Sequence, residues 1–521
     1  MVQTFSAGIC AMADHTHQVG FFVGDQLERT SQKCPEKIAV IFRDEKLTFA
    51  ALNERVSCLA GHLQNQGVKQ GDRVALLLPN STAFALSYYA TQRTGAVTVV
   101  LDARLKGKEL QGVLRDADVS FLITHQRLMP DFREALVELG RKPLWVVDGE
   151  GEQNFEKNLS PCSSEVIRPR LNPTDDAIIL YTSGTTGEPK GVVLNYVNLA
   201  QFPRCMEKMC ETGPGDVLGC ILPMSHISGP SYCDEIVDKG STLVIFDQMN
   251  PLALLEGIQR HRVTVFHAVP TVFQLLLGVQ NLREYDTSSV KVVGMMGSTV
   301  PLALMRAFKQ ARPHIKVVQG FGLTETSPMI TLTELHLADS KMASIGTEVP
   351  GVEVKIVDEN GREVAEGEEG EIVTRGPHVM KEYFRRPEAT AQRIRNGWLY
   401  TGDIGRRDGD GYYYHLGRKD DMIITGGLNV YPAEVENMLC EHPKVHEAIV
   451  FPIPDPKRGS VIGAAVVPQP GCEATERELL AFLRSNLANF KVPQKIVIRD
   501  SFPRTSMGKV IRDASTLLAS Q

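Results

Sequence analysis

The stretch Tyr181-Thr-Ser-Gly-Thr-Thr-Gly-Glu-Pro-Lys190-Gly191 carries the strongest signal in this chain of 521 residues. It follows an apolar segment and gathers four aliphatic hydroxyl groups, three glycines and one lysine. Glycines let backbone N–H groups approach an anion closely, hydroxyls add donors, and a lysine adds positive charge. The stretch therefore predicts a phosphate-binding loop made of Thr182, Ser183, Gly184, Thr185, Thr186, Gly187 and Lys190. Its spacing is not that of the GxxxxGK[ST] loop, and the residues after it read as a strand rather than a helix.

Outward from this loop, short apolar strands alternate with helical stretches. The strands are expected at Arg73–Leu78, Gly95–Leu101, Ala177–Tyr181, Val217–Leu222, Thr242–Phe246, Val263–Ala268, Val290–Gly294 and Ile315–Gln319. A helix-like stretch opens at Leu47-Thr48-Phe49, and Pro79-Asn80-Ser81 is placed to cap the next helix. This rhythm predicts an α/β fold with a largely parallel sheet.

The last third of the chain has a different pattern. Residues 345–416 are rich in Gly and Glu, with short strands at Glu353–Val357, Glu371–Thr374 and Gly411–Tyr414, so a small β-rich subdomain is expected. The rest reads as α+β, with a helix at Pro432–Cys440, strands at Ala448–Ile453, Gly463–Val467 and Lys495–Arg499, and a capping box at Thr475–Glu478. We therefore expect a large N-terminal domain, 1–418, that contains the β-rich subdomain, and a small C-terminal α+β domain, 419–521.

Composition narrows the class of protein. The net charge is -6, with Lys and Arg spread along the chain, which does not indicate a nucleic-acid partner. No apolar run reaches the length of a membrane helix, and the N-terminus lacks the pattern of a signal peptide. The ten cysteines are scattered without a CxxC pair, so reduced thiols and a cytoplasmic location are expected.

The quoted loop resembles the phosphate-binding signature of the adenylate-forming superfamily, which includes acyl-CoA synthetases, peptide-synthetase adenylation domains and beetle luciferases. The resemblance extends from about Pro35 to Arg512. It implies an α/β N-terminal domain, a mobile C-terminal domain, and an enzyme that converts a carboxylic acid and ATP to an acyl adenylate and then transfers the acyl group to a thiol.

A second motif, Gln319-Gly-Phe-Gly-Leu-Thr-Glu325-Thr326, follows the last of the expected α/β strands. It resembles the family's aromatic-Gly-x-Thr-Glu motif. An aromatic ring can stack on adenine, a hydroxyl can bind a phosphate oxygen, and a carboxylate can hold Mg²⁺. The resemblance gives these roles to Phe321, Thr324 and Glu325, and it places Gln319, Gly320 and Gly322 at the nucleotide.

Three further motifs lie towards the C-terminus. Trp398-Leu-Tyr-Thr-Gly-Asp403 resembles the segment whose aspartate binds the ribose hydroxyls, and Arg418 resembles its second ribose ligand. Asp420 matches the hinge between the two domains. Pro503-Arg-Thr-Ser-Met-Gly-Lys509 resembles the last core motif, whose lysine would stabilise the charge that develops on the α-phosphate during adenylation.

The acyl group is assigned by resemblance to Pro223-Met-Ser-His226-Ile227 and to the loop that begins at Met295. The pocket would be lined by His226, Ile227, Met295, Met296, Gly297 and Gly320, with His226 close to the carboxylate or gating the thiol. Relatives that activate amino acids carry an acidic residue at the position of Ile227, and an apolar side chain leaves an ammonium group unpaired. Met296-Gly297-Ser298-Thr299 departs from the usual Gly-Gly-Ala-Pro, and its contacts to the nucleotide stay open.

The resemblance implies ATP, Mg²⁺ and coenzyme A as reactants, with Gly426, Gly427 and Leu428 lining the CoA tunnel after a domain rotation. We expect a medium- or long-chain fatty acid as substrate, or an aromatic or alicyclic acid as the alternative. Three other functions stay open: an acyl-AMP ligase that loads a carrier protein, a luciferase-like oxygenase, and a non-catalytic nucleotide-binding protein. A homo-oligomer is also among the expectations. Lys190, Glu325 and Lys509 are all present, against the non-catalytic reading.

Overall fold

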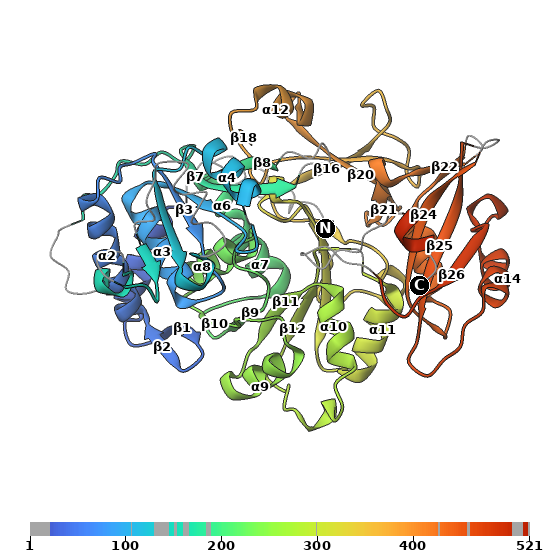
Figure 1. Cartoon of the computed structure of the whole chain (residues 1–521), viewed down its shortest axis with the longest axis horizontal. Helices are drawn as coiled ribbons and strands as arrows, with labels where there is room; N and C mark the ends of the chain where they lie inside the picture. Colours follow the sequence, from blue (N-terminus) through green and yellow to red (C-terminus); the bar gives the residue numbers. More distant parts are fainter. Residues whose placement is uncertain are drawn as a thin grey trace, which may run out of the picture.

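The structure, a computed structural model, describes residues 21–105, 107–129, 145–150, 154–159, 166–183, 189–298, 300–425, 428–455, 459–502 and 514–518. Its described strands form four sheets. Two large sheets make up the N-terminal part, a small sheet follows, and the C-terminal sheet lies apart at the right of Figure 1. The chain thus runs from large α/β layers to a small α+β unit.

The first large sheet has nine strands in the order β15-β14-β13-β12-β11-β9-β10-β1-β2. Their bounds are β1 Ile38–Phe42, β2 Glu45–Thr48, β9 Val217–Cys220, β10 Thr242–Ile245, β11 Val265–Ala268, β12 Val292–Met295, β13 Lys316–Phe321, β14 Thr331–Leu332 and β15 Thr347–Glu348. The strands from β1 to β13 in this order are parallel to one another, and β2, β14 and β15 pair antiparallel. Parallel strands place their carboxyl ends at one edge, where α/β proteins build their sites.

The second large sheet has seven strands in the order β18-β8-β7-β4-β3-β5-β6. Their bounds are β3 Arg73–Leu77, β4 Val97–Val100, β5 Phe121–His125, β6 Trp145–Val147, β7 Asp176–Ser183, β8 Pro189–Asn195 and β18 Glu382–Tyr383. Strands β7 and β8 form an antiparallel hairpin, and β18 pairs with β8 from far along the chain. This pairing brings residues around 383 to the phosphate-loop hairpin.

The described α-helices between Val23 and Ala311 form three layers around the two large sheets. One apolar core holds α1 Val23–Lys33, α2 Phe49–Asn65, α3 Thr82–Thr94, α6 Tyr196–Leu199, α7 Gln201–Cys210 and α8 Ser228–Lys239 against facing sides of both sheets. A second core packs α9 Pro251–His261, α10 Pro270–Leu277 and α11 Leu302–Ala311 on the far side of the nine-stranded sheet. A third packs α4 Gly107–Asp116 on the far side of the seven-stranded sheet.

The remaining two sheets follow in sequence. The small sheet contains β16 Glu353–Val357, β17 Gly370–Arg375, β19 Ile394–Arg395, β20 Trp398–Arg407 and β21 Tyr413–Arg418, beside α12 Pro387–Arg393. The C-terminal sheet contains β22 Ile423–Thr425, β23 Leu428–Val430, β24 Val445–Asp455, β25 Gly459–Pro468 and β26 Lys495–Ile498, with α13 Pro432–Cys440, α14 Glu476–Asn486 and α15 Ala514–Leu518. The C-terminal unit has apolar cores of its own.

The α/β fold class with its small C-terminal α+β unit is confirmed, and several caps are confirmed in detail. The Ser81 and Thr475 side chains cap α3 and α14 by accepting from Phe84 N and Glu478 N. The helix expected to open at Leu47 begins at Phe49 instead, because Thr48 ends β2 and caps α2.

Three other expectations need correction. The strand expected from Gly411 begins at Tyr413, because Gly411 adopts φ +88° in a turn. Strand β13 runs on to Phe321, since it gains an antiparallel partner in β14. Thiols are not all reduced: Cys58 is disulfide-bonded, although seven of the described cysteines are free.

Among the described helices, none combines the length and the apolar character needed to cross a bilayer.

Candidate active site

The predicted phosphate loop connects β7 to β8. The hairpin register pairs Thr182 with Lys190 and Tyr181 with Gly191. The Thr182 hydroxyl donates to the Lys190 carbonyl at 3.5 Å. Gly184, Thr185, Thr186 and Gly187 lie outside the described residues, as does the side chain of Ser183. Thr182 and Lys190 therefore lie opposite each other at the loop end of the β7–β8 hairpin.

Lys190 and Glu325 are brought together by Tyr383, which the sequence did not single out as a site residue. The Lys190 Nζ lies 5.6 Å from the centroid of the Tyr383 ring. The Tyr383 hydroxyl donates to Glu325 Oε1 at 2.7 Å. A cation over an aromatic face is attracted to its ring electrons. Tyr383 therefore joins the predicted phosphate lysine to the predicted metal carboxylate.

Electrostatics favour this arrangement. Burial raises the pKa of Tyr383, and the charge of Glu325 and its hydrogen bond raise it further. The phenol therefore stays a neutral donor near pH 7. Glu325 itself is only 9% exposed, and its backbone carbonyl accepts from Met380 N at 2.8 Å. The carboxylate is thus fixed at both its side chain and its backbone.

The second half of the site lies at the end of β13. The Phe321 ring stacks on His415, with centroids 5.3 Å apart and planes inclined by 29°. His415 Nε2 lies 2.9 Å from Asp403 Oδ1, and Arg418 Nη1 donates to Asp403 Oδ2 at 3.0 Å. Asp403 is 3% exposed. The structure thus joins the three residues predicted for adenine and ribose through one that was missed, His415.

His415 could not be found from its motif, because it precedes the Gly-Arg pair within an ordinary strand pattern. Strand β21 pairs antiparallel with β20, so that Arg418 is opposite Asp403. The register places both Arg418 and His415 at the carboxylate. Only the pairing of two strands shows this, since Asp403 and His415 are twelve residues apart.

Among the glycines of this region, Gly322 leaves the least room for a side chain. A Cβ added there would lie 1.6 Å from the carbonyl oxygen of Pro328. The short helical turn Thr324–Thr326, which carries Glu325, lies between these two residues and is closed by a hydrogen bond from Leu323 N to the Thr326 hydroxyl at 2.8 Å. Gly322 therefore permits the chain reversal that positions Glu325.

Replacing Gly322 with alanine should destabilise the protein by about 1–3 kcal/mol or more, because the backbone of Pro328 must move away from the added methyl group. Thermal unfolding monitored by circular dichroism would measure the loss. Gly213→Ala is the matched control, since a Cβ at Gly213 would meet nothing within 4 Å. An equal, small effect of both substitutions would contradict the packing argument.

Two predicted nucleotide residues have different surroundings. The Gln319 side-chain amide donates to the carbonyl of Met342 at 3.1 Å and also to that of Ser344, so it is held inside the protein. Thr324 lies in the turn beside Glu325 and is half-buried. The geometry thus supports a phosphate contact for Thr324 better than a nucleotide contact for the Gln319 side chain.

His226 lies in the segment before α8, and its Nε2 is 3.8 Å from Asp102 Oδ2. Burial alone would raise the pKa of Asp102, but hydrogen bonds from Arg104 and the charges of Arg104 and His226 lower it overall. The Asn80 side chain holds this segment, since its amide donates to the Leu222 carbonyl and its oxygen accepts from Met224 N. His226 thus faces an ionised carboxylate.

The predicted acyl-group residues do not all lie on one face of the nine-stranded sheet. Ile227 and Met296 pack against the core between the two large sheets. Gly320 faces the same core, because a Cβ there would meet Met329 and Leu332. Met295 is fully buried in the core on the opposite face, beneath α9, α10 and α11. We call the side that carries Ile227, Met296 and Gly320 the acyl face.

The structure describes some of the remaining predicted site residues and not others. Gly297 is exposed with φ +89°, a conformation that favours glycine, and Ser298 beside it is exposed. Asp420 lies in the exposed turn Lys419–Asp421, where the chain passes from β21 to β22. Leu428 begins β23 and is 48% exposed. Thr299, Gly426, Gly427 and Lys509 lie outside the described residues.

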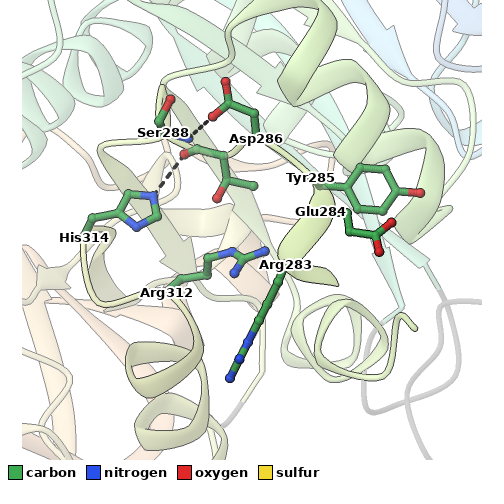
Figure 2. A pocket seen from close by; sticks show the side chains of 8 residues that line it. Arg283, Glu284, Tyr285, Asp286, Ser288, Arg312 and His314 are labelled. Carbon is green, nitrogen blue, oxygen red and sulfur yellow. Dashed lines mark hydrogen bonds between the residues drawn. The ribbon is translucent and has the colours of Figure 1, made fainter. Parts of the chain in front are cut away.

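A separate hollow of about 560 Å³ is lined by Arg283, Arg312 and His314, among others (Figure 2). These residues precede β12 and β13, at the amino ends of the parallel strands. Phe321 is the last residue of β13, and Glu325 follows its carboxyl end. The hollow is therefore at the other edge of the sheet and takes no part in the site.

Comparisons with known proteins identify the family and the fold. The signature of the family described as AMP-binding enzyme matches residues 27–384, and that of the AMP-binding enzyme C-terminal domain matches residues 434–509. A long-chain-fatty-acid–CoA ligase of Bacillus subtilis (strain 168) is 35% identical over 93% of this chain and 92% of its own. A feruloyl-CoA synthase of Amycolatopsis sp is 36% identical over 93% of this chain and 96% of its own.

Solved structures match as well. The anthranilate CoA ligase AuaEII in complex with anthranoyl-AMP superposes with a TM-score of 0.87, at 27% identity, over 96% of both chains. The ATP-bound MatB of Rhodopseudomonas palustris superposes with a TM-score of 0.86, at 29% identity, over 94% of this chain and 97% of its own.

Proposed function

The chain belongs to the AMP-binding enzyme family, and from this membership we propose that it activates a monocarboxylic acid with an apolar body, using the residues assembled around Glu325, Phe321 and Asp403. It is an AMP-forming acid–thiol ligase that uses ATP and CoA. The observation that carries the proposal is that Tyr383 contacts both Lys190 and Glu325, while Phe321, at the end of β13, stacks on the His415 ring that contacts Asp403.

The chemistry has two steps. A carboxylate oxygen attacks the α-phosphorus of ATP, pyrophosphate leaves, and the acyl adenylate forms. The thiol sulfur of CoA then attacks the acyl carbon, the thioester forms, the thiol proton is lost and AMP leaves. The protein contributes by positioning the reactants and by stabilising the charge that develops on the phosphates.

Each group of residues has one proposed task. Phe321 and His415 provide the surface for adenine, while Asp403 and Arg418 hold the ribose hydroxyls. Lys190 and the hydroxyl loop bind the phosphates that leave. Lys509 approaches the α-phosphate from the C-terminal unit. The contacts among Phe321, His415, Asp403 and Arg418 support the first two roles, and the resemblance supports those of the loop and Lys509.

Glu325 fits a magnesium site of a particular kind. Mg²⁺ in phosphate-transfer sites is held by one or two carboxylates together with phosphate oxygens and water. No cluster of three or more metal-binding side chains occurs among the described residues, and Glu325 supplies one carboxylate oriented by Tyr383, which also contacts Lys190. A bound Mg²⁺ would neutralise phosphate charge there, and Glu325 would hold it.

We also propose that the two half-reactions use two domain arrangements. Residues 1–418 and 419–521 would form the two domains, with Asp420 as the hinge. The separate cores of the C-terminal unit and the exposed turn at Lys419–Asp421 support this division. Rotation about Asp420 would replace Lys509 by the segment Gly426, Gly427 and Leu428, which would contact CoA.

The substrate follows from the acyl face. Ile227, Met296 and Gly320 offer neither an acidic partner for an ammonium group nor a cation for a second carboxylate. Amino acids and dicarboxylic acids are therefore poor candidates. A medium- or long-chain fatty acid fits the apolar lining and the B. subtilis relative. An aromatic acid is the second candidate, because Phe202 and Tyr232 reach the same face and a relative is named for ferulate.

Pyrophosphate release across a panel of carboxylic acids tests the proposal. With ATP and Mg²⁺, we expect release with apolar monocarboxylic acids, and steady turnover to a thioester only when CoA is added. Turnover with an acyl carrier protein but not with CoA, or consumption of O₂, would indicate the other reactions open to this family. No acyl adenylate from any acid would overturn the proposal.

A further inference from the structure

His267 is a buried imidazole on the acyl face. It lies in β11, in register with Cys220 of β9 on one side and with Gly294 of β12 on the other. Cys220 and Val318, which is paired with Gly294, belong to the core between the two large sheets, so His267 faces this core too. Its side chain is therefore on the same face as Ile227, Met296 and Gly320.

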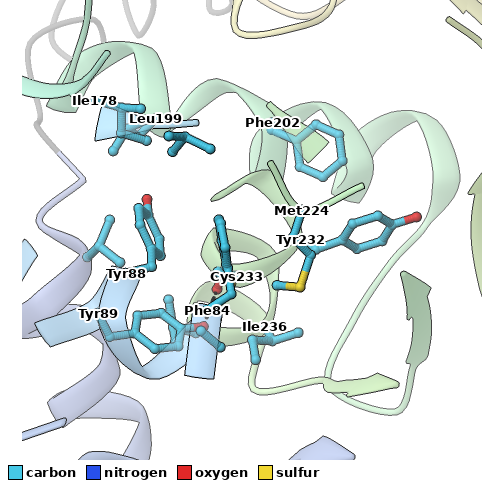
Figure 3. Packing of buried hydrophobic residues seen from close by; sticks show 14 of the residues in the cluster. Phe84, Tyr88, Tyr89, Ile178, Leu199, Phe202, Met224, Tyr232, Cys233 and Ile236 are labelled. Carbon is cyan, nitrogen blue, oxygen red and sulfur yellow. Dashed lines mark hydrogen bonds between the residues drawn. The ribbon is translucent and has the colours of Figure 1, made fainter. Parts of the chain in front are cut away.

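The Nε2 atom of His267 has no hydrogen-bond partner within the described residues, although the residue is only 3% exposed. Its ring stacks on Tyr232, with centroids 5.7 Å apart, and meets the edge of Phe202 at 6.3 Å. The Tyr232 hydroxyl accepts from the His267 backbone N–H at 3.0 Å. Figure 3 shows Phe202, Met224 and Tyr232 gathered in this part of the core.

Burial lowers the pKa of His267 to about 4, so the imidazole is neutral near pH 7. A neutral imidazole has one N–H donor and one acceptor nitrogen. A buried polar atom without a partner costs free energy, and nearly all such atoms in native proteins are paired with protein, water or ligand. The neighbours named above are carbon-rich, and burial raises the pKa of the nearby Cys220 thiol to about 12, which leaves it a weak partner.

One carbon next to Nε2 lies close to a predicted substrate residue, Met296. A Cβ built on Gly294 would lie 2.5 Å from His267 Cδ2, the carbon bonded to Nε2, and 2.6 Å from the terminal methyl of Met296. The Met296 methyl group therefore lies close to His267 Cδ2, one bond away from Nε2. Methionine is unbranched and flexible, and Met296 is half-buried, so a change of its rotamer would admit a substrate group to Nε2.

We propose that His267 Nε2 hydrogen-bonds a hydroxyl group on the acyl part of the substrate, so that the enzyme prefers hydroxylated carboxylic acids over their unsubstituted analogues. This inference rests on the proposed function. A hydroxyl group can donate or accept and therefore suits either tautomer of the imidazole. A second carboxylate or an ammonium group does not suit it, because Ile227, Met296 and Gly320 provide no charge to compensate either one.

Matched pairs of acids test this inference. The panel contains 4-hydroxycinnamic acid with cinnamic acid, and a hydroxylated fatty acid with its unsubstituted analogue, each assayed by pyrophosphate release. We expect kcat/KM of the wild-type enzyme to be about 10- to 100-fold higher for the hydroxylated member of at least one pair, because its hydroxyl satisfies a group that is otherwise unpaired. Equal values within every pair would overturn the inference.

Variants at position 267 locate the preference. His267→Phe keeps a buried aromatic ring without a hydrogen-bonding nitrogen, and we expect it to lose the preference through a fall in kcat/KM for the hydroxylated acid alone. His267→Gln keeps a polar group and should retain part of the preference. Equal losses for both acids in both variants would show a structural role instead. If wild-type enzyme releases no pyrophosphate with any acid, the proposed function itself has failed, which is a distinct result.

Discussion

Replacing Lys509 with alanine should lower the rate of acyl-adenylate formation by about 1000-fold, the largest effect that we expect. The physical reason is charge: the α-phosphate becomes more negative as the carboxylate attacks, and a positioned cation stabilises it. Removal of one such group typically costs about 100- to 1000-fold in kcat. ATP–pyrophosphate exchange in the presence of the acid measures this half-reaction. Thioester formation from a supplied acyl adenylate and CoA should change little, because Lys509 is proposed to leave the site before that step.

Two further variants make this result specific. Lys495→Ala removes the same charge from the exposed end of β26 in the same C-terminal unit and should leave both half-reactions unchanged. Asp420→Pro restricts the backbone at the proposed hinge and should have the opposite effect to Lys509→Ala, with adenylation kept and thioester formation blocked. Equal losses of both half-reactions in Lys509→Ala would contradict the assignment of Lys509, and normal CoA turnover in Asp420→Pro would contradict the hinge.

Glu325→Gln should reduce pyrophosphate release by about 100-fold or more and should raise the Mg²⁺ concentration needed for half-maximal rate. The amide keeps the shape of the side chain and can still accept from the Tyr383 hydroxyl, which lies 2.7 Å from Glu325 Oε1. It lacks the negative charge that a hard cation prefers. Rates measured as a function of Mg²⁺ concentration separate this effect from a general loss of activity.

The structure offers a closely matched control. Glu348 accepts from the Tyr413 hydroxyl at 2.6 Å, so it makes the same kind of pair as Glu325 and Tyr383. Glu348→Gln should leave the Mg²⁺ dependence unchanged. Tyr383→Phe removes the hydrogen bond but keeps the Glu325 charge, and a loss of about tenfold is expected. An unchanged Mg²⁺ dependence in Glu325→Gln would contradict the assignment of Glu325 as the metal ligand.

Much of the fold was predictable from local sequence. Apolar runs of four to six residues separated by amphipathic helices predicted the α/β layers, since these patterns depend on residues close in sequence. Ser81 and Thr475 were predicted as caps for the same reason, and the structure confirms both. The exact ends of the strands were harder to predict. Strand β13 extends to Phe321 because β14 pairs with it, and that partner was not visible in the pattern.

Motif residues were predictable where one segment carries them. The loop of Thr182 and Lys190, the turn with Glu325, and Asp403 with Arg418 were all read from short stretches. Tyr383 and His415 were missed, because each acts on a residue far away in sequence or on a neighbouring strand. Met295 and Met296 show the same limit: adjacent residues of one motif face opposite sides of a sheet, since side chains alternate along a strand.

The sequence by itself determined the kind of chemistry, because hydroxyls, glycines, carboxylates and lysines at these spacings are local properties of the chain. Tertiary structure decided how those groups are coupled. Pairing of β18 with β8 sets Tyr383 between Lys190 and Glu325, and pairing of β20 with β21 sets His415 on Asp403. It also decided that His267 is buried with an unpaired nitrogen beside Met296. Hydrogen bonds across strands depend on register and burial, which only the packed chain fixes.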